Sequence, residues 1–155
     1  MKIESARVDE IYILGDLVEM WIGDDDKSDN ATQLKATLKS TSSSCKIYIM
    51  HGNRDFLLGE KFCNATGVTL LKDPHIIDKH ILLSHGDILC TDDKDYQAAR
   101  TLFRDQSWQK EILEKPLAER EMLGKKLRTQ SAEANANKSV NIMDANAVSY
   151  THLRA

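Results

Sequence analysis

The sequence predicts a mixed α/β fold whose second half is helical. Three short runs, at residues 11–14, 46–50 and 80–84, are rich in isoleucine, leucine and tyrosine, and a glycine with a polar neighbour follows each run. Enrichment of this kind in short runs bounded by turn residues predicts strands. Between about residues 91 and 148, β-branched residues become rare and Ala, Glu, Lys, Arg and Leu predominate, which predicts helices.

The connecting segments carry further patterns. The elements they predict are a helix end at residues 1–10, helices at residues 30–40 and 56–66, a strand at residues 68–71, and an antiparallel hairpin of residues 75–77 with residues 80–84. Gly67 should end the second of the two complete helices in the left-handed conformation. Pro116 and Gly124 should divide the helical half, because both residues disfavour helix interiors.

The helical half also carries an apolar surface. Its members are Leu102, Phe103, Trp108, Ile112, Leu113, Leu117, Met122, Leu123 and Leu127. Apolar side chains at helical spacing ordinarily pack in a core, but on neighbouring helices they can also line a groove for an apolar ligand. The sequence leaves these two interpretations open.

Composition limits the class of protein. The chain has 155 residues, of which 41% are hydrophobic and 29% charged, so it has the length and composition of about one soluble domain. No apolar run approaches the roughly 20 residues that span a bilayer, and no signal peptide is apparent, so we expect a cytoplasmic location. Three widely spaced cysteines without CxxC pairing suggest neither a disulfide framework nor a zinc ribbon, and we expect reduced thiols.

Charge is distributed unevenly along the chain. Acidic residues outnumber basic ones over residues 1–93, whereas basic residues outnumber acidic ones over residues 94–138. An acidic body suits cations, and a basic helical segment suits an anionic ligand or a membrane surface. Solvated helices of mixed charge explain the second half equally well. We expect no nucleic-acid partner, and the oligomeric state stays open.

Potential metal ligands follow the three strand-like runs. Asp16, Asn53 and His85 each lie beside a glycine at the end of a run, and sites in open α/β sheets gather at the carboxyl ends of strands. The Asp16 carboxylate can bridge two cations, and a shell of Asp, Asn and His suits Mn, Fe or Zn. The pattern predicts a two-metal centre that activates water and binds phosphoryl oxygens. Three unrelated turns are the alternative, because Gly-Asp and His-Gly dipeptides are common.

These residues resemble the calcineurin-like metallophosphoesterase family. Gly15-Asp16-Leu17-Val18-Glu19, Gly52-Asn53-Arg54-Asp55 and His85 follow the order of the family signature. Longer strings within residues 12–26, 51–59, 85–93 and 131–139 are similar to the branch that hydrolyses a uridine-diphosphate-linked diacylglucosamine in lipid A biosynthesis. The resemblance implies a partial metallophosphoesterase β-sandwich core at residues 1–93 and a helical cap at residues 94–148. Residues 149–155 depart from the family as a non-native tail.

The resemblance also implies roles for individual residues. Asp16 would bridge two divalent ions, most simply Mn²⁺, and Asn53 and His85 would complete the shell of one of them. With Arg54, these three would form the catalytic set. The residues implied to contact substrate are Trp21, Asn53, Arg54, Asp93, Tyr96, Ser131, Asn135 and Lys138. The reaction implied is attack of an activated hydroxide on the pyrophosphate bond, giving diacylglucosamine 1-phosphate and UMP, by an enzyme peripheral to the inner membrane of Gram-negative bacteria.

Arg54 replaces a histidine that most members of the wider family use as an acid. A phosphate monoester has a second pKa of about 6 and can leave unprotonated near neutral pH, so cleavage of a pyrophosphate requires no general acid. A fixed guanidinium that binds the diphosphate serves that reaction better. The alternative is a surface arginine that pairs with Asp55.

Two family segments are missing from the sequence. The Asp-x-His strand that should precede residue 11 is absent, and so is the closing Gly-His-x-His. We therefore expect a chain truncated at both ends and inactive by itself. The alternatives are a non-catalytic remnant and a metallophosphoesterase that acts on another nucleotide diphosphate, such as a dinucleoside polyphosphate.

Overall fold

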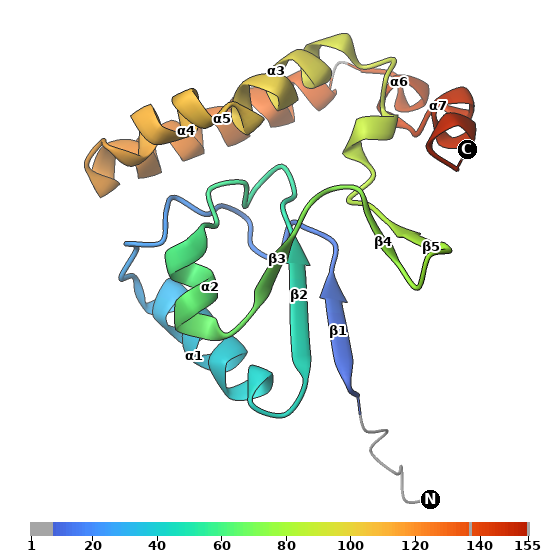
Figure 1. Ribbon diagram of the computed structural model, residues 1–155. Helices are drawn as coiled ribbons and strands as arrows, with labels where there is room; N and C mark the ends of the chain where they lie inside the picture. The colour runs from blue at the N-terminus through green and yellow to red at the C-terminus, as the bar shows by residue number, and fades with distance from the viewer. Residues whose placement is uncertain (1–7, 137, 155) are drawn as a thin grey trace, which may run out of the picture.

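A helical layer lies across one end of a small α/β core (Figure 1). The computed structural model describes residues 8–136 and 138–154, so most of the helix end expected at residues 1–10 lies outside the described part. Residues 8 and 9 are not helical, and Glu10 already belongs to the first strand. The mixed α/β class predicted from the sequence is confirmed.

The core is a three-stranded parallel sheet with the strand order β1-β2-β3. The strands are β1 (Glu10–Ile13), β2 (Lys46–Met50) and β3 (Thr69–Leu71), with Ile11 opposite Ile47 and Ile49 opposite Leu70. The crossover helices α1 (Asp29–Ser42) and α2 (Glu60–Thr66) lie together on one face (Figure 1). Because the strands are parallel, their carboxyl ends meet at one edge, beneath the helical layer.

The crossover helices end close to where the sequence predicts. Ser28 caps α1 by accepting a hydrogen bond from the Ala31 N–H, and Gly67 ends α2 with a φ of 77°. The prediction for α2 began too early. Asp24 accepts hydrogen bonds from the Gly59 and Phe62 N–H groups, so this distant carboxylate fixes where the helix begins.

The predicted hairpin forms, but it does not extend the parallel sheet. Strands β4 (His75–Ile77) and β5 (Ile81–Leu83) pair antiparallel as a separate two-stranded sheet. Three residues, 78–80, separate the paired residues Ile77 and Ile81. Asp78 and Lys79 turn the chain with φ values of 51° and 63°. His85 therefore reaches the edge of the core from a different sheet.

The second half is helical, as predicted. A short 3-10 helix, η1 (Asp87–Leu89), leads into α3 (Lys94–Arg104), α4 (Gln106–Leu113), α5 (Leu117–Ala136), α6 (Val140–Met143) and α7 (Ala147–Arg154). Pro116 separates α4 from α5, but the expected division at Gly124 is wrong. A Cβ at Gly124 would overlap the Met20 sulfur, so this glycine permits close approach of α5 to a core loop.

The predicted domain limits stay predictions, and α7 runs across the expected boundary between residues 148 and 149.

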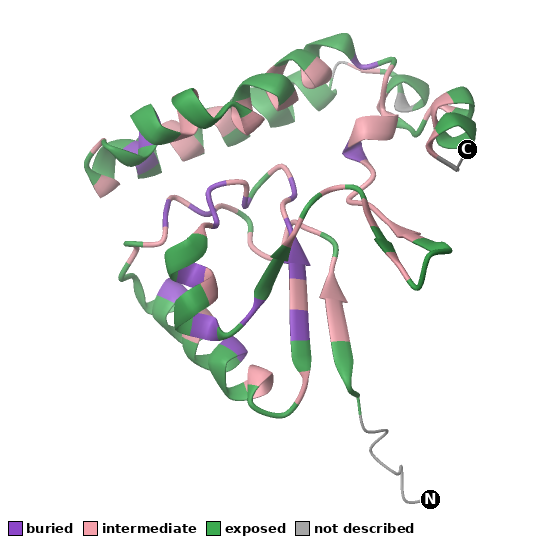
Figure 2. Cartoon of the chain, viewed as in Figure 1, coloured by how far each residue is buried: buried purple, intermediate pink, exposed green. Residues whose placement is uncertain are grey.

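The hydrophobic core lies between the sheet and the two crossover helices. Its most deeply buried apolar members are Ile49 and Phe62, each with 0% of its surface exposed. Buried segments of β2, α1 and α2 lie next to one another in Figure 2. Trp21 packs edge-on against Phe62 and joins the loop after β1 to this core. All three cysteines are free, as expected. Among the described residues, none of the helices combines the length and the apolar character needed to cross a bilayer.

Candidate active site

The ends of β1 and β2 interlock at the carboxyl edge of the sheet. A Cβ on Gly15 would come within 2.6 Å of the Gly52 nitrogen, so only glycine allows these two turns to approach so closely. Asp16 follows with a φ of 54°, and its Oδ1 accepts a hydrogen bond of 3.0 Å from the Arg54 N–H. The Asp16 and Asn53 segments are therefore neighbours, as the sequence predicts.

Asp55 connects the same two turns through hydrogen bonds. Its side chain is fully buried and accepts hydrogen bonds from the Gly52 N–H (2.6 Å) and the Leu17 N–H (2.8 Å). A buried carboxylate that accepts two backbone N–H groups is a fixed structural element. Pairing of Arg54 with Asp55, the alternative considered for Arg54, is therefore wrong.

His85 brings an imidazole close to the Asp16 carboxylate. Its Nδ1 lies 2.7 Å from the Leu14 carbonyl oxygen. Because a carbonyl can only accept, Nδ1 donates the proton of this hydrogen bond, and in the neutral ring the lone pair is then on Nε2. Nε2 lies 3.9 Å from Asp16 Oδ2, which is too long for a hydrogen bond. One ion with ligand distances of about 2.0–2.2 Å could contact both atoms.

The donor set fits one divalent ion better than two. Asp16 and His85 offer one oxygen and one nitrogen close to each other. Asn53, which follows Gly52, carries an amide oxygen, a ligand type that Mn²⁺ accepts. Within residues 8–136 and 138–154, no group of three or more His, Cys, Asp or Glu side chains is arranged to hold a metal ion. Two ions stay a prediction.

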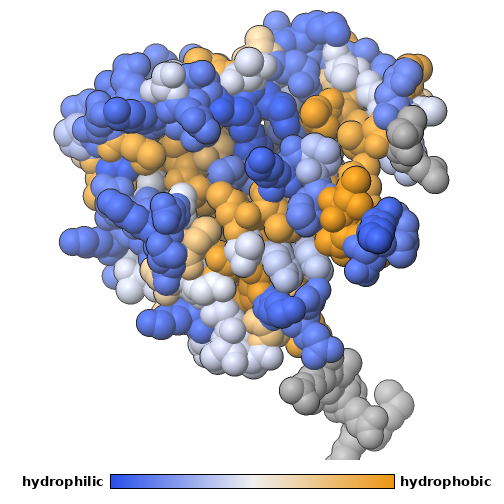
Figure 3. All heavy atoms as spheres, in the orientation of Figure 1, coloured by the Kyte–Doolittle hydropathy of each residue, from blue (hydrophilic) through white to orange (hydrophobic). Residues whose placement is uncertain are grey.

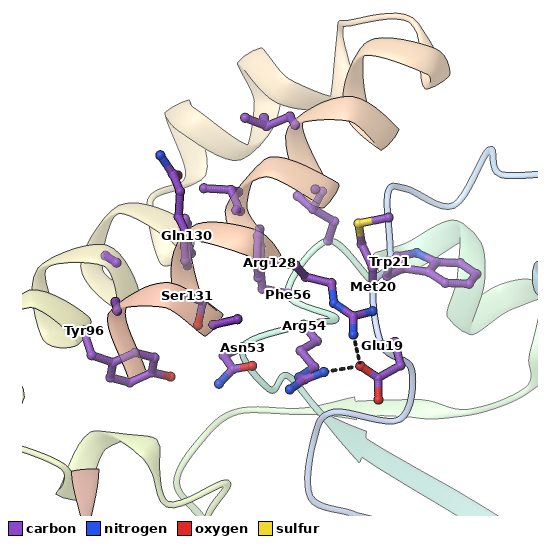
Figure 4. A pocket seen from close by; sticks show the side chains of 18 of the residues that line it. Glu19, Met20, Trp21, Asn53, Arg54, Phe56, Tyr96, Arg128, Gln130 and Ser131 are labelled. Carbon is purple, nitrogen blue, oxygen red and sulfur yellow. Dashed lines mark hydrogen bonds and ion pairs between the residues drawn. The ribbon is translucent and has the colours of Figure 1, made fainter. Parts of the chain in front are cut away.

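Arg54 points away from Asp55 and toward a cavity. Its guanidinium forms an ion pair with Glu19, and its Nε lies 3.7 Å from Asp16 Oδ2. Glu19 also pairs with Arg128 of α5 at 3.0 Å, so the carboxylate stands between two arginines from the two halves of the chain (Figure 4).

The cavity has a volume of about 560 Å³ and lies between the core loops and helices α3, α4 and α5. Apolar side chains gather below the helical layer on the face shown in Figure 3. Phe56 stacks on Phe103 with ring centroids 5.0 Å apart, and Trp108 lies 6.0 Å from Phe56. Leu123 and Leu127 of α5 add aliphatic side chains to the lining of the cavity. One part of the cavity is therefore suited to an apolar ligand.

The residues predicted to contact substrate gather at this cavity. Trp21, Asn53, Arg54, Tyr96, Ser131, Asn135 and Lys138 all line it. Asp16, His85 and Asp93 do not belong to the lining. In Figure 4, Asn53, Tyr96 and Ser131 surround a common space, and Arg54 lies beside them. Their binding roles stay predictions.

Asp93 supports its neighbours instead of forming the wall. Its carboxylate accepts hydrogen bonds from Lys138 Nζ at 2.6 and 2.7 Å and from the Tyr96 N–H at 3.0 Å. Burial disfavours the carboxylate, but the Lys138 ammonium and the Tyr96 N–H outweigh burial and hold the pKa of Asp93 below its ordinary value. Asp93 thus caps α3 and fixes two side chains that do line the cavity.

Core packing and cavity lining overlap on the apolar helical surface. Ile112 is buried in the core and also lines the cavity, and Trp108 and Leu123 line the cavity while packing against the core. Binding of an apolar ligand there stays a prediction.

Arg120 is a buried contact that the sequence analysis missed. Only 4% of this residue is exposed, and its guanidinium donates to the Ile22 carbonyl (2.6 Å) and to both Asp25 oxygens (2.8 and 2.5 Å). It fastens α5 to the loop that carries Trp21. Nothing in the sequence distinguishes this arginine from the exposed cations of the same helix.

Replacing Asp25 with asparagine should lower stability in a pH-dependent way. The Arg120 guanidinium holds the pKa of Asp25 below its ordinary value, so the ionised form stabilises the fold. That contribution is complete above about pH 5 and is lost as the pH falls through the lowered pKa. Urea unfolding should therefore give a constant deficit for the variant from pH 5 to 7 that shrinks below about pH 4. A deficit that grows on acidification would contradict this assignment.

Comparison with known proteins agrees with the resemblance. The chain is 49% identical over 149 residues to a UDP-2,3-diacylglucosamine hydrolase of Aromatoleum aromaticum, covering 92% of this chain and 60% of the relative. The chain is similar to UDP-2,3-diacylglucosamine hydrolases. Enzymes of this name from Chromohalobacter salexigens and Escherichia coli O157:H7 are 45% and 44% identical, over 91% and 92% of this chain. No protein-family model matches. The chain spans about 60% of the length of these hydrolases.

Proposed function

We propose that this chain carries the substrate site of a metal-dependent hydrolase that cleaves UDP-2,3-diacylglucosamine into 2,3-diacylglucosamine 1-phosphate and UMP. One observation carries the proposal. Arg54 and Asn53 line the cavity and are also adjacent to the Asp16 carboxylate, so one concave surface joins phosphate-binding groups to a hydrophobic compartment. A ligand that is anionic at one end and acylated at the other matches this surface.

The chemistry of the cavity lining supports a lipid-linked nucleotide. A volume of about 560 Å³ lies within the ordinary range for small-molecule sites, roughly 300–1,000 Å³. Ser131, Asn135 and Lys138 supply hydroxyl, amide and ammonium groups for the sugar and nucleotide, and Phe103, Trp108 and Leu127 supply an apolar wall for acyl chains. A water-soluble nucleotide would leave that wall exposed to solvent.

Asp16, His85 and Asn53 are the residues that would hold divalent ions, for which we propose Mn²⁺. Such ions supply an activated water and neutralise charge on phosphoryl oxygens. The chain's own contribution is orientation: the Leu14 carbonyl fixes the His85 tautomer, and the Arg54 N–H fixes the Asp16 carboxylate. Arg54 would bind the diphosphate, and the departing phosphate needs no proton from the protein.

The finer fold assignment belongs to the same proposal. Residues 1–93 would form part of a metallophosphoesterase β-sandwich core, and residues 94–148 would form its helical cap. Exposed Met122, Leu102 and Leu113, together with the exposed cations Lys125 and Lys126 of α5, support peripheral contact of this cap with the cytoplasmic face of the inner membrane.

Reading the gene on both sides of this sequence and assaying the encoded protein tests the proposal. We expect Asp-x-His upstream, Gly-His-x-His downstream, and Mn²⁺-dependent release of UMP that EDTA abolishes. The 155-residue chain alone should release little or no UMP, because its described residues bring together donors for one ion only.

Two results would contradict the proposal. In the first, a start and a stop codon lie at the ends of this sequence and the protein releases no UMP. The protein would then be a non-catalytic remnant. Faster hydrolysis of a dinucleoside polyphosphate than of the lipid nucleotide would assign another substrate.

A further inference from the structure

Helix α3 faces both the cavity and the metal-ligand loops. Tyr96, Ala99 and Phe103 line the cavity from one side of the helix. Arg100 and Arg104, one helical turn apart, direct their guanidinium groups to the loops that carry Asn53 and His85. A single rigid helix thus contacts both parts of the proposed site.

Arg104 binds the backbone directly before Asn53. Its Nη2 donates to the carbonyl oxygens of His51 (3.1 Å) and Gly52 (3.0 Å). One guanidinium nitrogen has two N–H groups, so it can hold two successive peptide planes at once. These planes determine the direction in which the Asn53 side chain leaves the chain.

A buried ionic cluster holds Arg104 in place. Asp87, whose side chain is 6% exposed, accepts hydrogen bonds from Arg100 Nε (2.9 Å) and the Tyr96 hydroxyl (2.8 Å) and lies 3.9 Å from Arg104 Nη2. Asp73 lies 3.6 Å from Arg100 Nη2. Two arginines and two aspartates balance in charge, as a buried cluster requires.

The same cluster reaches the His85 segment. Asp73 Oδ1 accepts hydrogen bonds from the His85 N–H (3.2 Å) and the Ser84 hydroxyl (2.7 Å). The cluster therefore contacts the backbone of two loops: the loop before Asn53, at Gly52, and the loop that carries His85.

We propose that Arg104 is a positioning residue that fixes the backbone from which the Asn53 side chain extends. The inference rests on the proposed function, in which Asn53 is a metal ligand. An arginine that only attached α3 to the core could bind any nearby carbonyl. This one binds the two carbonyls that precede the ligand, and Asp87 connects it to Tyr96 in the cavity wall.

The test compares three variants of the 155-residue chain. Arg104→Gln removes the charge and the forked donor, Arg104→Lys keeps a charged donor, and Lys110→Gln removes an exposed cation of α4 as a matched control. Three measurements are made on each variant: Mn²⁺ affinity from the electron paramagnetic resonance signal of free Mn²⁺, hydrogen–deuterium exchange of residues 51–54, and the Tm.

We expect Arg104→Gln to weaken Mn²⁺ binding about 10–100-fold, the usual effect of losing a group that orients a ligand. Exchange at residues 51–54 should accelerate while exchange in β2 stays unchanged. Arg104→Lys should recover part of the affinity, and Lys110→Gln should match the wild type. If Arg104→Gln does not fold, the Lys variant must still show weaker Mn²⁺ binding with β2 protected.

If Arg104→Gln binds Mn²⁺ with wild-type affinity but has a lower Tm, the inference is overturned, and Arg104 only stabilises the fold. A wild-type chain that binds no Mn²⁺ is a failure of the proposed function instead. In that case exchange alone decides, and unchanged exchange at residues 51–54 in Arg104→Gln overturns the inference.

Discussion

Replacing Asp16 with asparagine should lower the affinity of the chain for Mn²⁺ by at least about 100-fold. Loss of a group that merely orients a ligand typically costs 10–100-fold, and Asp16 is itself the charged donor. The amide oxygen of asparagine can still accept the hydrogen bond from the Arg54 N–H, so the turn should persist. Mn²⁺ titration followed by electron paramagnetic resonance measures the change.

The control for this variant is Asp9→Asn. Asp9 is exposed and lies just before β1, at the opposite end of this strand from Asp16, and its replacement changes the net charge equally. Equal Mn²⁺ affinities for the two variants would mean that the metal binds elsewhere or only through general electrostatic attraction. A cooperative unfolding transition like that of the wild type should accompany the loss in Asp16→Asn.

Replacing Leu127 with arginine should weaken binding of UDP-2,3-diacylglucosamine about 100-fold. Leu127 lines the cavity from α5, and burying such a side chain against acyl chains contributes about 1.5–3 kcal/mol. A cation in the apolar compartment adds the cost of desolvating an unpaired charge. Each 1.4 kcal/mol corresponds to a tenfold change in Kd. Intrinsic fluorescence reports binding, because the only two tryptophans, Trp21 and Trp108, both line the cavity.

Met122→Arg is the matched control on the same helix. Met122 is 71% exposed and does not line the cavity, so the same charge at this position should leave the affinity within about twofold of the wild type. Equal losses for both variants would indicate a general electrostatic effect. UDP-N-acetylglucosamine, which lacks long acyl chains, should bind all three proteins alike.

The sequence was most informative where local chemistry decides the structure. The strands before Asp16 and Asn53, the left-handed stop at Gly67 and the hairpin turn at Asp78 and Lys79 all follow from short patterns. The ordered Asp, Asn and His positions also predicted which loops converge. The Asp16–His85 distance of 3.9 Å bears this out even though His85 arrives from a separate sheet.

Long-range contacts account for what the sequence could not predict. Gly124 reads as a helix breaker, but it is a point of contact with Met20, more than 100 residues earlier in the chain. Asp24 determines where α2 begins from 35 residues away. Arg104 and Arg120 look like solvated cations of basic helices until the fold brings backbone carbonyls to them.

The central claim is that one cavity holds both the diphosphate and the acyl chains, and a pair of titrations tests it most directly. The wild-type chain, with Mn²⁺ present, is titrated with UDP-2,3-diacylglucosamine and with UDP-N-acetylglucosamine while tryptophan fluorescence is recorded. We predict that the acylated ligand binds at least about 100-fold more tightly, because several buried methylenes each contribute about 0.8 kcal/mol. Equal affinities, or no fluorescence change with either ligand from a folded chain, would contradict the account.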